Sequence, residues 1–464
     1  MTDTSESQSR VASFFEFEKH GTDAKTEVVA GITTFLTMSY IIVVNPAILS
    51  AAISIEGYSD GQVFQMLAIT TILAAAVGST VMALYANRPF GLAPGMGLNA
   101  YFAFTVVIAL GIPWQTALAA VFVEGVVFIA MSSVGARRYI IEFFPEPVKF
   151  AVGAGIGLFL LLLGLIEINV AVADEATLVS LGNVASDPVA LLALAGLAFT
   201  IVLYAMDVTG SIITGIVATA AAGWVLTLAG VVDGGVLTPD GLPPINYDIT
   251  PLVGAFLSGF QDIEPVSFLI VVLTFFFVDF FDTAGTLIGV SQFGDFLDED
   301  GNLPEMEKPL MADAVATTFG AIVGTTTVTT YVESSTGVEE GGRTGLTALV
   351  VALLFLASLV LVPVVAAIPT YASYLGLVLV GLIMLQGVTD IQWDDAEWLI
   401  PGGLTIVMMP LTASIANGIA AGIISYPIVK AAQGDHRSIH VAQWILAGSF
   451  VLYFYVTAGG VMGG

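Results

Sequence analysis

The stretches Phe90–Asn99 (FGLAPGMGLN) and Gly324–Ser334 (GTTTVTTYVES) interrupt an otherwise apolar chain, and they decide its fold. Neither suits a continuous helix, because glycine loses backbone entropy and runs of β-branched residues lose χ1 freedom. Irregular backbone survives in hydrocarbon only where protein or a water-filled cavity satisfies its polar groups. Broken segments at corresponding positions of two halves are the best sequence indication of a transporter's binding site.

The composition is that of a membrane protein. The chain of 464 residues has a mean hydropathy of +0.94, with 57% hydrophobic and 11% charged residues, which excludes a soluble globular fold. Its polar residues cluster between apolar runs long enough to cross a bilayer core of roughly 30 Å. A further apolar stretch covers 441–458. We predict about fourteen transmembrane segments, which are numbered in chain order: 29–49, 66–86, 92–110, 115–133, 148–168, 188–206, 211–231, 266–290, 310–324, 331–346, 347–368, 373–389, 399–413 and 414–432.

The charge and the cysteine content exclude several classes of function. The chain has no cysteine, which rules out disulfides, thiolate metal sites and cysteine nucleophiles. The net charge of −27 excludes nucleic-acid binding by its sign. It fits an acidic surface suited to high salt, as in a halophile, better than the capture of a cationic substrate. We expect no cofactor, no metal site and no catalytic residues.

The eleven basic residues predict the orientation of the chain, since Lys and Arg near span ends mark the cytoplasmic side. With fourteen spans all of them fall on one side, which places the N-terminus in the cytoplasm. The loop at 232–265 carries acidic residues and no basic one, and it falls outside. The basic residues are Arg10, Lys19, Lys25, Arg88, Arg137, Arg138, Lys149, Lys308, Arg343, Lys430 and Arg437.

The sequence predicts two repeats of opposite orientation, because seven spans on each side of an external linker must run in opposite directions. Echoes such as 70–80 and 317–326, each just before a broken segment, support a duplication. The expected fold is an all-α polytopic membrane protein, a seven-plus-seven inverted repeat with short antiparallel strands interrupting segments 3 and 10. Its parts are a cytoplasmic tail (1–28), the first repeat (29–231), an extracellular linker (232–265), the second repeat (266–432) and a C-terminal extension with one apolar segment (433–464).

Ionisable groups inside a membrane are costly, so each one is a candidate functional residue. Asp279 and Asp282 lie three residues apart on one helical face, among five phenylalanines. No Lys or Arg inside a central span neutralises them, so they must be protonated, bonded to a ligand or paired with a coupling cation. Glu333 follows the threonine run, and Glu124 lies in the middle of segment 4. The alternative for Asp279 is that it caps a broken helix. The alternative for Glu124 is that it is a buried protonated acid bonded to a neighbouring helix.

The two interruptions should meet near the middle of the membrane. The run Thr325–Thr330 favours a strand, as does the stretch around Pro94, and inverted repeats would pair the two antiparallel. Half-helices would then start after each strand, with Asn99 and Glu333 at their positive N-termini. An amide and a carboxylate suit a flat heterocycle with alternating N–H and C=O groups, on which Tyr331 could stack. An ordinary helix cap for Asn99 and an interface aromatic for Tyr331 are the alternatives.

Long motifs resemble the azaguanine-type purine permeases, a branch of the nucleobase–cation symporters (the xanthine/uracil permease family) related to the uracil permease. Carried over by motif, Asn99, Asp282 and Glu333 resemble that branch's purine-binding residues, with Asp279 close by. Tyr331-Val332-Glu333 matches a Tyr-x-Glu of the uracil permease, and Ser334 joins the candidate substrate-binding set. The motifs are FFEFEKHGTDAKTEVVAGITTFLTMSYIIVVNP (14–46), FGLAPGMGLNAYFAF (90–104), FVDFFDTAGTLIGV (277–290) and TTTVTTYVESSTGVEEGGRTGLTA (325–348).

The resemblance implies a core domain of spans 1–4 and 8–11 and a gate domain of spans 5–7 and 12–14. It also implies uptake of hypoxanthine, adenine or guanine with H+ across the plasma membrane, with Asp282, Asp279 and Glu124 as candidates for coupling. The acidic surface leaves Na+ open as the coupling ion. The expected partners are a purine nucleobase, the lipid bilayer and a second copy bound through the gate domain. The stretch 441–458 departs from the family's pattern.

Three alternatives remain at this point. The substrate could be another nucleobase, such as xanthine or uracil. A sulfate-type anion permease is disfavoured because Asp282 and Glu333 would repel a dianion. An intramembrane aspartyl hydrolase could use Asp279 and Asp282, but such a dyad normally brings one acid from each of two segments. We therefore expect a transporter and not an enzyme.

Overall fold

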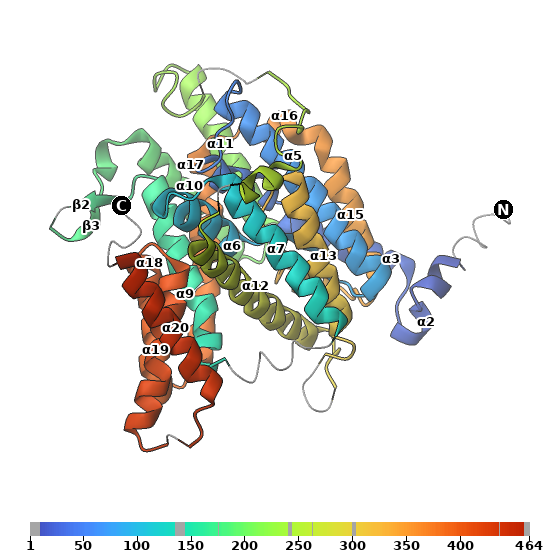
Figure 1. The fold of residues 1–464 in the computed structure, drawn as a ribbon. Helices are drawn as coiled ribbons and strands as arrows, with labels where there is room; N and C mark the ends of the chain where they lie inside the picture. The colour runs from blue at the N-terminus through green and yellow to red at the C-terminus, as the bar shows by residue number, and fades with distance from the viewer. Residues whose placement is uncertain are drawn as a thin grey trace. The chain divides into compact units, whose positions relative to one another are not determined.

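The computed structural model describes residues 10–134, 144–174, 176–239, 244–261, 263–298, 303–435 and 437–458. These residues are mainly helical, as Figure 1 shows. They form two compact units, one of 1–133 with 164–379 and the other of 134–163 with 380–464. Arg137 and Arg138, which contribute to the predicted orientation, lie outside the described residues.

Two helical halves of the first unit have the same interrupted order. Each contains a short strand followed by a short helix, placed between long apolar helices. The first half comprises α2 (Phe17–His20), α3 (Ala24–Met38), α4 (Ile41–Ser50), α5 (Asp60–Val81), the π-helix η1 (Met82–Ala86), β1 (Leu92–Pro94), α6 (Met96–Ala100), the π-helix η2 (Tyr101–Ala109) and α7 (Trp114–Ser133). The second half comprises the 3₁₀ helix η4 (Ala255–Phe260), α12 (Pro265–Phe293), α13 (Glu307–Val323), β4 (Val328–Thr330), α14 (Ser334–Glu339), α15 (Gly345–Ser358), the 3₁₀ helix η5 (Leu359–Leu361), α16 (Val362–Val365) and the greater part of α17 (Thr370–Met384).

The remaining elements are divided between the two units. In the first unit, a hairpin precedes a helical pair: β2 (Ala171–Asp174), β3 (Leu178–Leu181), the 3₁₀ helix η3 (Val184–Ser186), α10 (Pro188–Ala205) and α11 (Ser211–Leu228). The second unit contains the greater part of α9 (Glu146–Glu167), then the 3₁₀ helix η6 (Leu385–Asp390), α18 (Ala396–Leu411), α19 (Ile415–Ala432) and α20 (Val441–Ala458). Within it α18 packs on α19, and α19 on α20. The apolar stretch 441–458 noted in the sequence forms a single helix, α20.

The helices confirm a polytopic membrane protein. Among the described residues, ten helical segments are long and apolar enough to cross a membrane. Shorter apolar helices cover Met96–Ala109, Ala396–Leu411 and Val441–Val451. The predicted tenth span differs most from expectation, because its helix α14 has only six residues. The run that precedes α14 is a strand, as its β-branched residues favour.

The strands lie inside the first unit, among its long helices. There α3 packs on α15, α5 on both α13 and α15, and α13 on α7, an arrangement that Figure 1 shows side by side. Phe90, Leu92 and Val328 are fully buried members of one apolar cluster, together with Leu287 of α12. The burial of both strands in protein meets the condition for irregular backbone at membrane depth.

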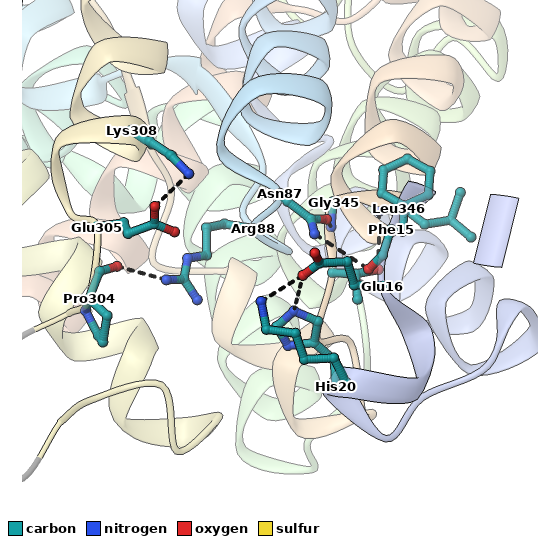
Figure 2. A network of polar contacts seen from close by, with 12 residues as sticks. Phe15, Glu16, His20, Asn87, Arg88, Pro304, Glu305, Lys308, Gly345 and Leu346 are labelled. Atoms are coloured by element: carbon teal, nitrogen blue, oxygen red, sulfur yellow. Dashed lines mark hydrogen bonds and ion pairs between the residues drawn. The ribbon is translucent and has the colours of Figure 1, made fainter. Parts of the chain in front are cut away.

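The predicted tail 1–28 is helical in part. From Arg10 on it is described, and Phe15 and Phe17 are 4% and 6% exposed. Asn87, which has a positive φ of 48° after η1, donates from its amide to the Phe15 carbonyl at 3.4 Å. The same side chain accepts from the Gly345 backbone N–H at 2.8 Å (Figure 2). Asn87 thus connects the N-terminal segment to the start of α15.

Glu27 joins the two halves at a second point. This α3 residue is fully buried, and its carboxylate lies at the start of α15. It accepts from the backbone N–H groups of Arg343 at 2.9 Å and Thr344 at 3.2 Å, and from the Thr347 hydroxyl at 2.6 Å. The first N–H groups of a helix have no partner within it, and the helix dipole favours an anion there. Glu27 therefore stabilises the start of α15.

We expect Glu27→Ala to lower the free energy of unfolding by about 2–4 kcal/mol, because it leaves several buried donors without an acceptor. Denaturant unfolding of the purified protein in detergent measures this change. Glu18→Ala is the control, since Glu18 is exposed on the neighbouring α2. Equal stability losses in the two variants would contradict the role given to Glu27.

Candidate substrate site

The two interruptions meet as a pair of antiparallel strands. Leu92 lies opposite Thr330, and Pro94 opposite Val328, with every residue of both strands buried. Two further backbone bonds extend the pairing, from the Tyr331 N–H to the Gly91 carbonyl and from the Gly95 N–H to the Thr327 carbonyl, each 3.0 Å. The predicted strand pair is confirmed. It brings the two broken segments, from opposite halves of the chain, into one place.

The threonine hydroxyls of the second interruption bond to four different helices. Four threonines of the run make these bonds. One hydroxyl accepts from the Asn45 amide, and the other three donate to the oxygen of an amide or of a carboxylate. All four threonines are buried. The pairs are Thr325 with Asn45 of α4 at 3.1 Å, Thr326 with Asn99 of α6, Thr327 with Glu124 of α7 at 3.0 Å, and Thr330 with Asp313 of α13 at 2.9 Å.

Asn99 lies inside a half-helix rather than at its start. The expectation that it begins the helix is wrong, because Gly95 is extended and the helix starts again at Met96. Asn99 is fully buried, its Nδ2 donates to the Pro94 carbonyl at 3.3 Å, and its Oδ1 accepts from Thr326. The Asn99 amide therefore bonds to both interruptions. The second N–H of Nδ2 has no partner among the described residues.

Tyr331 and Ser334 also bond to the first interruption. The Tyr331 hydroxyl donates to the Pro94 carbonyl at 2.5 Å, and its side chain is 5% exposed. The Ser334 hydroxyl accepts from the Gly91 N–H at 3.0 Å. Both residues hold the strand pair together. Stacking of Tyr331 on a ligand and a direct role of Ser334 remain predictions.

Glu333 and Asp282 are the two half-buried acids of the site. Glu333 lies between β4 and α14, where the sequence predicts it, and its Oε1 accepts from the Tyr40 hydroxyl at 2.5 Å. Asp282 of α12 is close enough to Glu333 for their charges to repel. Within the described part of the chain, no donor bonds to the Asp282 carboxylate. Asp282 and Glu333 are thus two acids whose carboxylate oxygens could accept hydrogen bonds from a ligand.

Comparison with known proteins identifies the family. The family's sequence model, described as a permease family of the xanthine/uracil type, matches residues 25–421. The chain belongs to the xanthine/uracil permease family. This permease is 41% identical to the guanine/hypoxanthine permease PbuO of Bacillus subtilis, over 95% of this chain and 100% of that protein. It is 40% identical to the adenine permease AdeP of Escherichia coli, over 94% of each chain.

The fold of the permease also resembles solved structures. The transmembrane domain of a cyanobacterium bicarbonate transporter, BicA, has a TM-score of 0.59 at 15% identity, with 86% of the permease and 97% of that domain covered. The murine anion transporter Slc26a9 has a TM-score of 0.58 at 11% identity, covering 89% of the permease and 69% of that chain. Identities this low show the fold alone, and they confirm the predicted fold class. The relatives are named permeases, so the expectation of a transporter rather than an enzyme is confirmed as well.

The two aspartates of α12 have different neighbours in the permease. Asp282 lies near Glu333, whereas Asp279 is 2% exposed and accepts from the Thr283 hydroxyl at 3.2 Å. Asp279 also interacts with the carboxyl group of Glu124, which is fully buried in α7. Two adjacent carboxylates repel each other, so such a pair favours binding of a proton. Asp279 and Asp282, which share one helical face as their spacing predicts, thus interact with two different acids.

Sequence reasoning missed two polar residues of this region. Tyr40 interrupts the first span between α3 and α4, and its hydroxyl reaches Glu333. Asp313 of α13 is 2% exposed and accepts from Thr330. Asp313 could have been found as an acid inside an apolar span. Tyr40 gave no such signal, because a tyrosine in an apolar run is unremarkable. The described residues contain no group of three or more acids and histidines able to hold a metal ion.

Proposed function

We propose that the permease takes up purine nucleobases (hypoxanthine, adenine or guanine) by cation symport. The observation that carries the proposal is the approach of Asp282 and Glu333, two half-buried carboxylates next to the paired interruptions. Relatives named guanine/hypoxanthine and adenine permeases, at 40–41% identity over nearly the whole chain, support the same class of substrate.

The chemistry of the two acids suits a purine. Purine rings carry N–H groups at their edges, and hydrogen bonds from N–H to a carboxylate are charge-assisted and strong. An anion would meet two carboxylates instead, so the anion chemistry of the structural neighbours does not suit this site.

Coupling to a cation follows from the same charges. The negative charges of Asp282 and Glu333 repel each other. A proton that binds to Asp282, before the ligand or together with it, would relieve this repulsion. The buried pair of Glu124 and Asp279 is a second place for a proton. Na+ is the alternative coupling ion, suggested by the net charge of −27 and the saline habitat that such a charge fits.

The membrane setting and the movement complete the proposal. The permease lies in the plasma membrane with its N-terminus in the cytoplasm, on the side of the basic residues. The strand pair and its helices move as a rigid core against a gate formed by spans 5–7 and 12–14, through which two copies associate. Residues from both halves that contact one ligand must stay in register, which favours rigid-body movement around a fixed site.

Uptake into proteoliposomes tests the substrate class. With an inward proton gradient we expect the purified permease to accumulate labelled hypoxanthine, and unlabelled adenine or guanine to compete more strongly than uracil or sulfate. Replacing the proton gradient by a sodium gradient identifies the coupling ion. Accumulation of sulfate without accumulation of any nucleobase would overturn the proposal.

Glu333→Gln should weaken purine binding by roughly 1.5–3 kcal/mol, because the variant keeps the shape of the side chain but loses the charge that strengthens the hydrogen bond. Equilibrium binding of labelled hypoxanthine to the purified protein measures the change. Glu339→Gln makes the same substitution at an exposed position of α14 and should leave the affinity unchanged. An unaltered affinity of the folded Glu333 variant would remove Glu333 from the substrate site.

Asp282→Asn should abolish accumulation against a gradient more completely than it abolishes binding, because the amide cannot take up and release the coupling proton. Counterflow and gradient-driven uptake, measured side by side, separate exchange of bound substrate from accumulation. Asp295→Asn is the control, since Asp295 is exposed two residues after α12. A variant that still concentrates purine with the wild-type pH dependence would move the coupling role to Asp279 and Glu124.

A further inference from the structure

We propose that Tyr40 is a positioning residue for substrate recognition: its hydroxyl fixes the carboxylate of Glu333 so that one oxygen is left for the ligand. The inference rests on the proposed function, in which Glu333 accepts from the purine. Tyr40 acts through Glu333 and is not assigned a contact with the ligand. It comes from the first half of the chain, whereas Glu333 comes from the second.

Tyr40 is held rigidly at the break between two helices. It follows α3 and precedes α4, and its side chain is fully buried. The Ile42 N–H bonds to the Ser39 carbonyl at 3.1 Å and the Val43 N–H to the Tyr40 carbonyl at 3.0 Å, so the turn itself is hydrogen-bonded. A buried ring on a bonded turn has little rotational freedom left. Its hydroxyl is therefore a fixed donor.

The backbone of Glu333 is held by the same helix. Thr37 and Thr336 share a hydrogen bond between their hydroxyls at 3.2 Å, and the Thr336 hydroxyl donates to the Glu333 carbonyl at 2.7 Å. Close approach of α3 and α14 requires glycine at 337, where a Cβ would lie 2.0 Å from the Thr34 hydroxyl oxygen. Both the main chain and the carboxylate of Glu333 thus take their position from α3 and the turn after it.

The hydrogen bond from Tyr40 makes the two carboxylate oxygens of Glu333 different from each other. Oε1 accepts from the hydroxyl at 2.5 Å, and no other side chain among the described residues donates to the carboxylate, so Oε2 is the oxygen that can accept from a ligand. The only other tyrosine described next to Glu333, Tyr331, already donates to the Pro94 carbonyl. Without the Tyr40 hydroxyl the Glu333 carboxylate would be free to rotate. The ligand would then have to immobilise a long side chain, and the entropy lost on binding would lower the affinity for the ligand.

Tyr40→Phe tests the inference, since it removes only the hydroxyl. We expect the dissociation constant for labelled hypoxanthine to rise about tenfold and the KM of uptake to rise with it, while the maximal uptake rate stays within about twofold. In a Glu333→Gln background the same substitution should change the affinity less than about twofold, because the charged oxygen that it positions is already lost.

Tyr374→Phe is the matched control. Tyr374 is 3% exposed, and its hydroxyl donates to the Ala47 carbonyl at 3.1 Å, so it loses an equally buried bond away from Glu333. Its affinity should stay within about twofold of the wild type. Thermal melting of both variants in detergent separates a general loss of structure, which would lower binding by both proteins, from the specific effect.

The outcomes are distinct. An unchanged affinity of the folded Tyr40→Phe protein overturns the inference, as does an equal loss in the wild-type and Glu333→Gln backgrounds. If Tyr374→Phe lowers the affinity as much as Tyr40→Phe does, the effect is structural and the inference is again wrong. Failure of the wild type to bind any purine would instead overturn the proposed function, and this inference with it.

Discussion

Backbone that leaves the helix inside a membrane must find its hydrogen-bond partners within the protein, and the arrangement around the strands follows from that requirement. Two three-residue strands satisfy only part of it, and Pro94 has no N–H to offer. Hydroxyls of the preceding helices supply further partners: Ser79 of α5 accepts from the Leu92 N–H and donates to its carbonyl, and Thr317 of α13 does the same for Val328. Polar residues that would be unfavourable in an apolar helix are thereby required at fixed positions around the break.

The sequence was sufficient to locate the breaks, because composition alone disfavours helix at 90–99 and 325–330. It also predicted the antiparallel pairing of the breaks and four acids inside apolar segments: Glu124, Asp279, Asp282 and Glu333. It was not sufficient to assign partners. Asp279 and Asp282 share a helical face by spacing, yet Glu124 approaches one and Glu333 the other, and only the packing of α7 and α14 decides this. Tyr40 was missed for the same reason, since its hydrogen-bond partner Glu333 is 293 positions away in the chain.

Fold and chemistry are separable in this protein. The backbone arrangement is shared with transporters of bicarbonate and other anions at 11–15% identity. The side chains that approach the paired strands here are acids and hydroxyls, however, and in the described residues no Lys or Arg joins Asp282 and Glu333. A shared fold therefore does not determine the chemistry, which has to be argued from the side chains that each protein places on it.

The antiparallel pairing of β1 with β4 bears on how such a chain arises. Two strands paired in this way are related by a twofold axis, so a half-length ancestor inserted in both orientations could have paired one strand with its own copy. Two halves joined in one gene need not keep identical strands. Ala93 now faces Thr329, and Pro94 faces Val328. One strand is apolar and the other carries hydroxyls, so two halves joined in one chain form an asymmetric contact where two identical copies would form a symmetric one.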